Sequence, residues 1–349
     1  TPIKSSAASD VYKRQAYWNT KQAEMAQPPF LGEVLFPSRK QAGLELKYIK
    51  GAKGMPAEMN VSAFDAKTIK KDRVGVSEVR TKRPFFKNVM TIEELTRQEL
   101  LIAIQSNNEE YIKPLIRNIF DDETTLVDDA AVTREILRMQ LLSTGTISLA
   151  NNGQEFLYDY GLDTKQKVTA ATKWDTTTAD ILGDIQQWQD DREAAGYGRP
   201  TRAITSRKVM RNMQKNDAIK NALYVFGQGK VMITEDMVKN YIQEQTGVTI
   251  EVYEKKYKAL DGTVKRFLPE DLFILIPDGN LGETMFGTTP EEADLVASNR
   301  ANVSIVDTGV AITTYEDVDP VTVHTKVSEV VLPSFEMADY IVIAEVLSW

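Results

Sequence analysis

Residues able to do chemistry are scarce in this sequence. It contains one histidine, His324, and no cysteine. Without cysteine, disulfides, thiolate metal sites and thiol nucleophiles are excluded. His324 lies in Val321–Val327, where apolar and polar residues alternate as in a β-strand. We therefore predict a structural role for this histidine, and we assign no catalytic residue.

Three glycine-containing segments have part of a binding motif. Gly227–Lys230 lacks the first glycine of a phosphate-binding loop, and Val231 stands where a serine or threonine is required. Gly196–Gly198 lacks the third glycine of a dinucleotide fingerprint. Asp278–Asn280 lacks the spacing of a calcium-binding EF-hand loop and follows a proline, as in a turn. We interpret all three as turns, so no cofactor and no metal is predicted.

Adjacent carboxylates are the remaining candidates for catalysis. The pairs are Asp121/Asp122, Asp128/Asp129, Asp190/Asp191 and Glu291/Glu292. Glycosidase-type chemistry needs two carboxylates at a set separation across a cleft, which adjacency in sequence does not establish. Such pairs usually mark helix starts or solvated faces. A soluble carboxylate-dependent hydrolase nevertheless stays open as an alternative function.

Composition is that of a folded globular chain. The 349 residues are 42% hydrophobic and 26% charged. This length allows about two domains, or one domain with long appendages, around a core that needs no disulfides. No run approaches ~18 consecutive apolar residues and no signal peptide is visible, so we expect a soluble protein made in a cytoplasm, with no membrane partner.

Charge is unevenly distributed. Residues 38–87 contain 13 basic and 5 acidic side chains, a net charge of +8, while the whole chain carries −8. The rest therefore carries −16, and opposite charges of this kind can steer association between copies. A solvated basic loop is the simpler alternative. A nucleic-acid-binding arm is less favoured, because residues 67–83 contain no aromatic side chain for stacking on bases.

The N-terminal third predicts extended structure. Residues 1–15 have no apolar period, so we expect a disordered or non-native tail. Prolines at both ends of residues 28–37 favour an extended arm that docks through its apolar side chains. These are Phe30, Leu31, Leu35 and Phe36. Residues 44–86 are predicted to form a long hairpin, because apolar and polar residues alternate at both of its ends. It has few large apolar residues, so it should be mobile or held down by another chain.

The middle of the chain predicts helices. One runs from about Ile92 to Gln105, and a second begins near Thr125, where Thr125–Asp128 fits a capping box. The second helix should be about 28 Å long and end at Gly145. Its buried stripe is Leu126, Ala130, Leu137 and Leu141.

The last half predicts a mixed α/β region. Capped helices are expected from the cap at Thr177–Asp180 to Gly196, at 206–213 and at 234–245, with strands at 202–205 and 272–276 and a hairpin around Asp261–Gly262. Late strands at 303–314, 321–331 and 340–347 should return to the core that holds the long helix.

Several blocks of sequence resemble the lambda-like major capsid proteins of tailed bacteriophages, the capsid protein E family. In chain order they are Phe30–Pro37, Thr172–Trp188, Val252–Pro277, Leu281–Pro290 and Pro333–Asp339. The resemblance covers nearly the whole chain from about Ala16, although each block is structural rather than a catalytic signature.

The resemblance implies an α+β fold of the Hong Kong 97 capsid type. Its parts would be an N-arm (16–43), an extended E-loop hairpin (44–87), a peripheral domain with a long spine helix (88–167), an axial domain (168–294) and return strands of the peripheral domain (295–349), after the tail 1–15. E-loop residues expected between subunits are Lys50, Lys53, Lys67, Lys70, Lys71, Arg73, Arg80 and Arg83.

The implied function is that of a non-enzymatic major head protein. It would self-assemble as hexamers and pentamers into an icosahedral shell around double-stranded DNA, bound without sequence specificity. Portal, scaffold or decoration proteins would be further partners, and the protein would reside in the virion after assembly in the bacterial cytoplasm. An encapsulin-like cellular compartment is the alternative with the same fold. Shell cross-linking through Lys67, Lys70 or Lys71 is not expected, since no matching asparagine and glutamate pair is evident.

Overall fold

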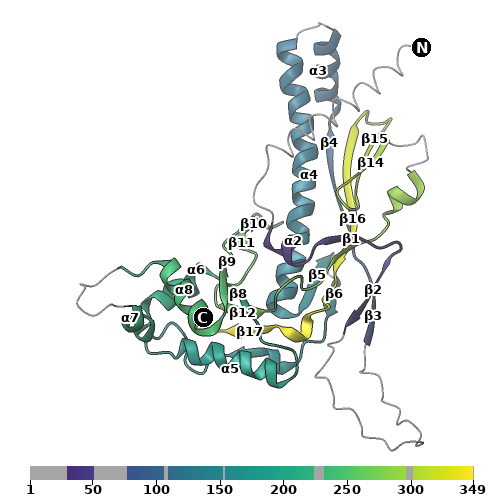
Figure 1. Cartoon of the computed structure of the whole chain (residues 1–349). Coiled ribbons are helices and arrows are strands. Elements are labelled where there is room, and N and C mark those ends of the chain that lie inside the picture. The colour runs from purple at the N-terminus through teal and green to yellow at the C-terminus, as the bar shows by residue number, and fades with distance from the viewer. Residues whose placement is uncertain are drawn as a thin grey trace, which may run out of the picture.

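The structure is a computed structural model that describes residues 30–50, 77–105, 109–151, 154–223, 232–295 and 302–348. Its helices and strands gather around one long helix and two sheets (Figure 1). The long helix and its neighbouring sheet form an upright part, and a second sheet with its helices extends to one side of its base.

The long helix, α4 (Glu109–Thr144), has 36 residues, and α3 (Glu94–Gln105) packs against it. α4 spans ~54 Å at 1.5 Å per residue. It ends where Gly145 adopts a left-handed φ of 71° and its N–H donates to the Leu141 carbonyl. The predicted start near Thr125 is wrong, because Thr125 lies inside α4 and no glycine or proline in 115–144 interrupts the helix.

The sheet beside α4 has six strands in the order β1-β13-β16-β15-β14, with β4 also paired to β16. Their bounds are β1 Ser38–Lys40, β4 Phe85–Ile92, β13 Thr284–Phe286, β14 Asn302–Val306, β15 Val310–Glu316 and β16 Val323–Pro333. β16 is central because β4 and β15 both pair antiparallel with it. The sheet thus combines strands from residues 38–92 with strands from residues 284–333.

The second sheet has five strands in the order β7-β17-β12-β8-β9. Its strands are β7 Lys167–Thr169, β8 Arg202–Thr205, β9 Thr249–Val252, β12 Leu272–Ile276 and β17 Val342–Glu345. The helices on it are α5 Ile181–Ala194, α6 Arg207–Lys215, α7 Asp217–Leu223 and α8 Glu235–Thr246. Asp180, Ser206 and Thr234 cap α5, α6 and α8 through their side chains.

The remaining elements are hairpins and short turns of helix. The hairpins are β2 (Glu45–Lys50) with β3 (Ser77–Lys82), β5 (Thr146–Asn151) with β6 (Gln154–Asp159), and β10 (Lys256–Lys258) with β11 (Val264–Arg266). The short helical turns are α2 (Leu31–Leu35), η1 (Thr164–Gln166), η2 (Glu291–Leu295) and η3 (Ala338–Tyr340).

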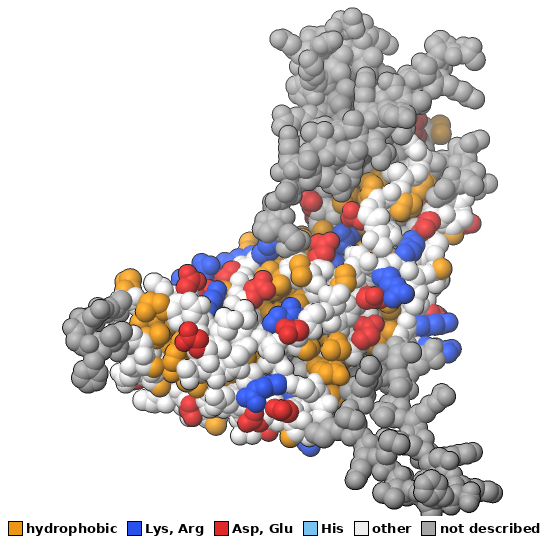
Figure 2. All heavy atoms as spheres, in the orientation of Figure 1, with side chains coloured by type: hydrophobic (Ala, Val, Ile, Leu, Met, Phe, Trp, Pro, Cys, Tyr) orange, Lys and Arg blue, Asp and Glu red, His pale blue; other side chains and the backbone are white. Residues whose placement is uncertain are grey.

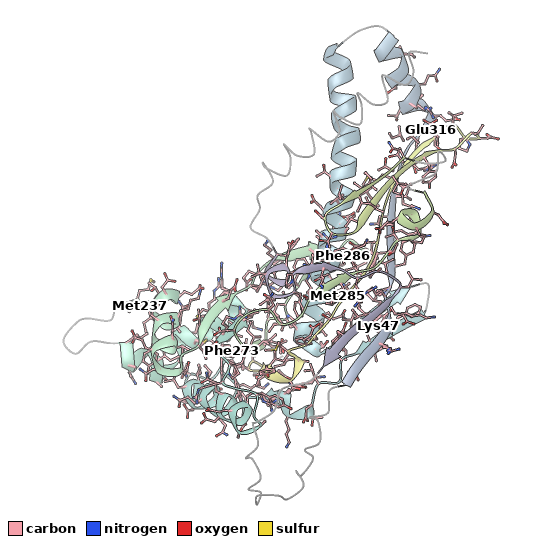
Figure 3. The ribbon with its side chains drawn as sticks, turned by 45° about the vertical axis from the view of Figure 1, so that its right-hand side comes forward. Lys47, Met237, Phe273, Met285, Phe286 and Glu316 are labelled. Atoms are coloured by element: carbon pink, nitrogen blue, oxygen red, sulfur yellow. The ribbon has the colours of Figure 1, made fainter. Side chains whose placement is uncertain are left out.

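The five-stranded sheet separates two hydrophobic cores. Ile274 of β12 packs in the core around α4, whereas its neighbours Phe273 and Leu275 pack in the core under α5, α6 and α8. Figure 3 shows Phe273 in this second region and Phe286 near α4. Alternation along one strand therefore serves both cores, because successive side chains point to opposite faces of a sheet.

One expectation about the chain ends is wrong, and another is confirmed. Residues 31–35 form one helical turn instead of an extended arm, because Leu31, Leu35 and the backbone of Gly32 pack on α4. The last strand, β17, lies in the five-stranded sheet between β12 and β7, and its Ile343 packs in the core around α4, as predicted, whereas Val342 and Ala344 pack in the second core. Alternating apolar residues predict a strand without specifying its partner. The division into N-arm, E-loop, peripheral and axial parts stays a prediction.

Candidate assembly surfaces

The four residues predicted to dock an N-terminal arm pack against other parts of the same subunit. Leu31, Leu35 and Phe36 are buried, and the Phe36 ring meets Phe335 edge-on with centroids 5.7 Å apart. Phe30 lies against Phe267 at 5.6 Å. Within the described residues, this segment is part of the subunit core, and an arm that reaches a neighbour would have to lie before it.

A buried charged network connects this segment to α4. The Glu135 carboxylate accepts from the Gly32 backbone N–H at 3.1 Å and from the Tyr253 hydroxyl at 2.7 Å. Arg138 lies 3.6 Å from Glu135 and donates to Thr284 Oγ1 at 2.9 Å. Burial raises the pKa of Glu135 and that of Tyr253, and it lowers the pKa of Arg138. The network thus fixes the chain before β1 and the chain after β9 to one turn of α4.

A second buried pair joins α4 to β16. Arg134 NH1 lies 2.7 Å from Glu329 Oε2, and both side chains are almost fully enclosed. The Arg134 guanidinium also stacks over Phe286, 5.6 Å from the ring centroid. Sequence reasoning missed both pairs. The signal was available, because the charged Arg134, Glu135 and Arg138 interrupt the apolar stripe of this helix.

The predicted stripe of α4 is enclosed. Leu126, Ala130, Leu137 and Leu141 have exposed fractions of 2%, 9%, 1% and 0%. All four belong to the core shared with β16 and the chain before β1. α4 therefore contributes both apolar and charged side chains to the same core.

The base of the β2–β3 hairpin is held by Arg83. Its guanidinium donates to the Gly43 carbonyl at 2.9 Å and the Gln41 carbonyl at 3.2 Å, and also contacts the Gln41 side chain. Arg83 was predicted to contact another subunit, and this is wrong, because the side chain is 6% exposed and bonded within its own chain. Arg80 is exposed, and Lys50 lies in β2. The other predicted E-loop residues lie outside the described residues: Lys53, Lys67, Lys70, Lys71 and Arg73.

A groove of about 1790 Å³ runs between this hairpin base, α4, and the β5–β6 and β10–β11 hairpins. Large apolar side chains at its border are exposed, with Leu157 at 65% and Leu260 fully open to solvent. Elsewhere, the face seen in Figure 2 carries both signs of charge with apolar side chains between them. A groove with an apolar border is suited to contact with another protein surface.

The structure places His324 and one of the glycine-containing segments. His324 Nε2 lies 3.0 Å from Asp317, its Nδ1 lies 2.8 Å from Thr91 Oγ1, and its ring stacks on Tyr315. Gly196 and Gly198 have left-handed φ angles of 88° and 77°, as in turns. Gly227–Lys230 lies outside the described residues.

No group of three or more metal-binding side chains occurs in the described ranges. Among the helices of those ranges, none is long and apolar enough to cross a bilayer.

Comparison with known proteins identifies relatives. The family described as phage major capsid protein E matches residues 15–346. A search of curated proteins found no match.

Solved structures share the fold. A capsid protein of a prophage of E. coli CFT073 aligns with a TM-score of 0.55 and 18% identity, over 78% of this chain and 79% of that one. A capsid chain of cyanophage A-1(L) aligns with a TM-score of 0.53 and 11% identity, over 93% and 95%. A phage-related protein of Bordetella bronchiseptica RB50 gives 0.51 and 14%, over 91% and 92%. The fold is therefore that of Hong Kong 97-type capsid proteins.

Proposed function

The chain belongs to the phage major capsid protein E family, and from this premise we propose that it assembles as hexamers and pentamers into an icosahedral shell around double-stranded DNA. Its role is that of a structural major capsid protein. The observation that carries the proposal is the family match over residues 15–346, which spans both sheets and the long helix. We place the protein in the virion, after assembly in the bacterial cytoplasm.

The structure of the subunit supports a role in self-association. The groove of about 1790 Å³ with exposed Leu157 and Leu260 offers apolar area that contact with another subunit would bury. The basic segment 38–87 would meet the acidic surface of a neighbouring copy. Packaged DNA would be held without sequence specificity, and portal, scaffold or decoration proteins would complete the head.

The test is the mass of the purified protein in solution. We would express the full chain and measure sedimentation at low and high salt, with negative-stain images of the same samples. Hexamers, pentamers or closed shells are expected, and the assembled fraction should fall as salt screens the charged contacts. A stable monomer at every salt and concentration, also when co-expressed with the other head proteins, would overturn the proposal. Shells that enclose only a protein cargo would favour a cellular compartment instead.

The hairpin supplies a second test. Deleting Gly51–Lys71 should leave a folded subunit that fails to close shells, because the deletion removes 21 of the 50 residues of the basic segment, with four of its 13 basic side chains, and spares β2 and β3. Circular dichroism would check folding, and sedimentation would check assembly. Normal shells from this variant would remove the hairpin from the proposal.

A further inference from the structure

The helices α5 and α6 lie at opposite edges of the layer that covers the five-stranded sheet, with α8 packed against both (Figure 1). Trp188 of α5 stacks at 5.8 Å on Trp174, which follows the edge strand β7. At the other edge, the Arg207 backbone N–H of α6 donates to Glu254, which follows the edge strand β9, at 2.6 Å. The two helices therefore border different sides of this part of the subunit.

The layer narrows toward α7. Asn216, just after α6, donates through Nδ2 to the Ala179 carbonyl, just before α5, at 2.7 Å. The Asp217 N–H donates to the Thr177 carbonyl at 2.8 Å. The end of α6 and the start of α5 thus meet, while the start of α6 and the end of α5 lie apart. The layer is a wedge with its narrow end beside α7.

The α6 edge is basic. Arg207, Lys208 and Arg211 are exposed and form no ion pair within the described part of the chain. Together with Arg266 they line a hollow of about 340 Å³. The two carboxylates in this hollow, Glu254 and Glu270, both form ion pairs with Arg266. The hollow therefore holds four cations and two carboxylates, which leaves an excess of positive charge on this edge.

The α5 edge is acidic. Asp190, Asp191 and Glu193 are exposed near the end of the helix, and Asp184 lies partly exposed nearer its start. Arg199 reaches two of these carboxylates, with NH1 2.7 Å from Asp190 and 3.3 Å from Glu193. Among the described residues, the Asp191 carboxylate accepts only from the neutral amide of Gln187, at 2.9 Å. This edge keeps an excess of negative charge.

We propose that the basic α6 edge of one copy binds the acidic α5 edge of the next copy. This inference rests on the proposed function and names the surfaces that join subunits within a capsomer. The contact is heterologous, because it joins two different surfaces, the α6 edge of one copy and the α5 edge of the next. Wedge-shaped subunits that repeat this contact around their narrow ends can close into a ring. Opposite charges steer the edges together and reject like edges.

The experiment is a charge exchange between the two edges in the full chain. Arg207→Glu with Arg211→Glu reverses the basic edge, and Asp190→Lys with Asp191→Lys reverses the acidic edge. Glu93→Lys with Glu99→Lys, two exposed residues at α3 outside both edges and the groove, is the control, with the same change of net charge as the acidic-edge variant. Each edge variant should raise the protein concentration needed for assembly by about tenfold or more at low salt. The chain that carries all four edge substitutions should assemble again, and the control should assemble as the unaltered chain does.

The outcomes separate this inference from the proposed function. Failure of the unaltered chain to assemble counts against the proposed function. Normal assembly of both edge variants, or no recovery in the fourfold variant, overturns only the pairing of these edges. Normal shells with less nucleic acid from the α6 variant would assign the basic edge to nucleic acid and also overturn it. Circular dichroism would show whether a charge reversal prevents folding. In that case the contact is tested by neutral variants, Arg207→Gln with Arg211→Gln and Asp190→Asn with Asp191→Asn, which should reduce assembly by a smaller amount.

Discussion

The two faces of the five-stranded sheet are packed by different means. On the side of α5, α6 and α8 the core is apolar, with Trp174 stacked on Trp188 and 5.0 Å from Phe273. No ion pair with two buried partners occurs there among the described residues. On the opposite side, α4 carries Glu135 and its arginine neighbours into the core.

This difference follows the way each core is assembled from the chain. The apolar core uses the nearly continuous segment 168–276 and is completed by β17. The core around α4 joins segments that are distant in sequence, such as residues 31–36, 126–142 and 327–335. Apolar contacts are non-directional, whereas charge-assisted hydrogen bonds require a set geometry. We interpret the buried charges as the groups that fix the orientation of these distant segments.

The largest effect is expected in the apolar core. Trp174→Ala removes both aromatic contacts and the hydrogen bond from Nε1 to Asp184 at 2.8 Å. The free energy of unfolding should fall by about 3–5 kcal/mol, measured by urea denaturation of the unassembled subunit. Trp174→Phe, the control, keeps an aromatic ring and should cost less than half as much. A loss below about 1 kcal/mol for the alanine variant would show that this core is not tightly packed.

A slightly smaller loss is expected on the charged side. Glu329→Leu leaves Arg134 buried, with Asp307 at 3.6 Å as its remaining acidic partner. The free energy of unfolding should fall by about 3 kcal/mol, because an uncompensated buried charge is costly. Arg134→Met combined with Glu329→Leu should recover most of this loss in the same measurement. If the double variant is as unstable as the single one, the pair is not the cause.

The docking of the α2 segment gives a third test. A Cβ at Gly32 would lie 2.4 Å from Glu135 Oε2 and 2.8 Å from Arg138 Cδ. Gly32→Ala should therefore destabilise the subunit by about 1–3 kcal/mol, because the side chains around it must shift. The neighbouring exposed Glu33 offers the control, and Glu33→Ala should have little effect on the melting temperature. Equal melting temperatures for the two variants would contradict the close packing.

The smallest effect should depend on pH. Burial favours the neutral form of Glu291, but the bond from Lys326 Nζ at 2.6 Å, the charge of Lys326 and further hydrogen bonds to the carboxylate together outweigh it, and the pKa of Glu291 is lowered. Its contribution to stability is therefore present above the ordinary pKa of a glutamate and is lost as pH falls through the lowered value. Glu291→Gln should cost about 1–2 kcal/mol at pH 7 and progressively less in acid. A cost that is unchanged between pH 7 and pH 3 would contradict the ion pair.

Local signals were predictable to within a residue or two. Asp180, Ser206 and Thr234 cap their helices, Gly145 and Gly247 end theirs, and β8 and β12 have the predicted bounds. These features depend on side chains close in sequence. The start of α4 was missed because a capping pattern at Thr125 is a local preference that an uninterrupted helix overrides. The contacts of Arg83 were missed because they depend on where the chain before β2 lies.

Residue types and their spacing were enough to predict the absence of thiol chemistry, the strand and helix periods, most of the caps, and a resemblance that the family match confirmed. These follow from residue type and from spacing along the chain. The folded chain was needed to see that β17 joins the five-stranded sheet, that Arg83 turns inward, that four charged residues are buried in the core around α4, and that α5 and α6 present opposite charges on opposite edges. Periodicity tells which face of an element is apolar, but the partner of that face is set by packing between segments that are distant in sequence.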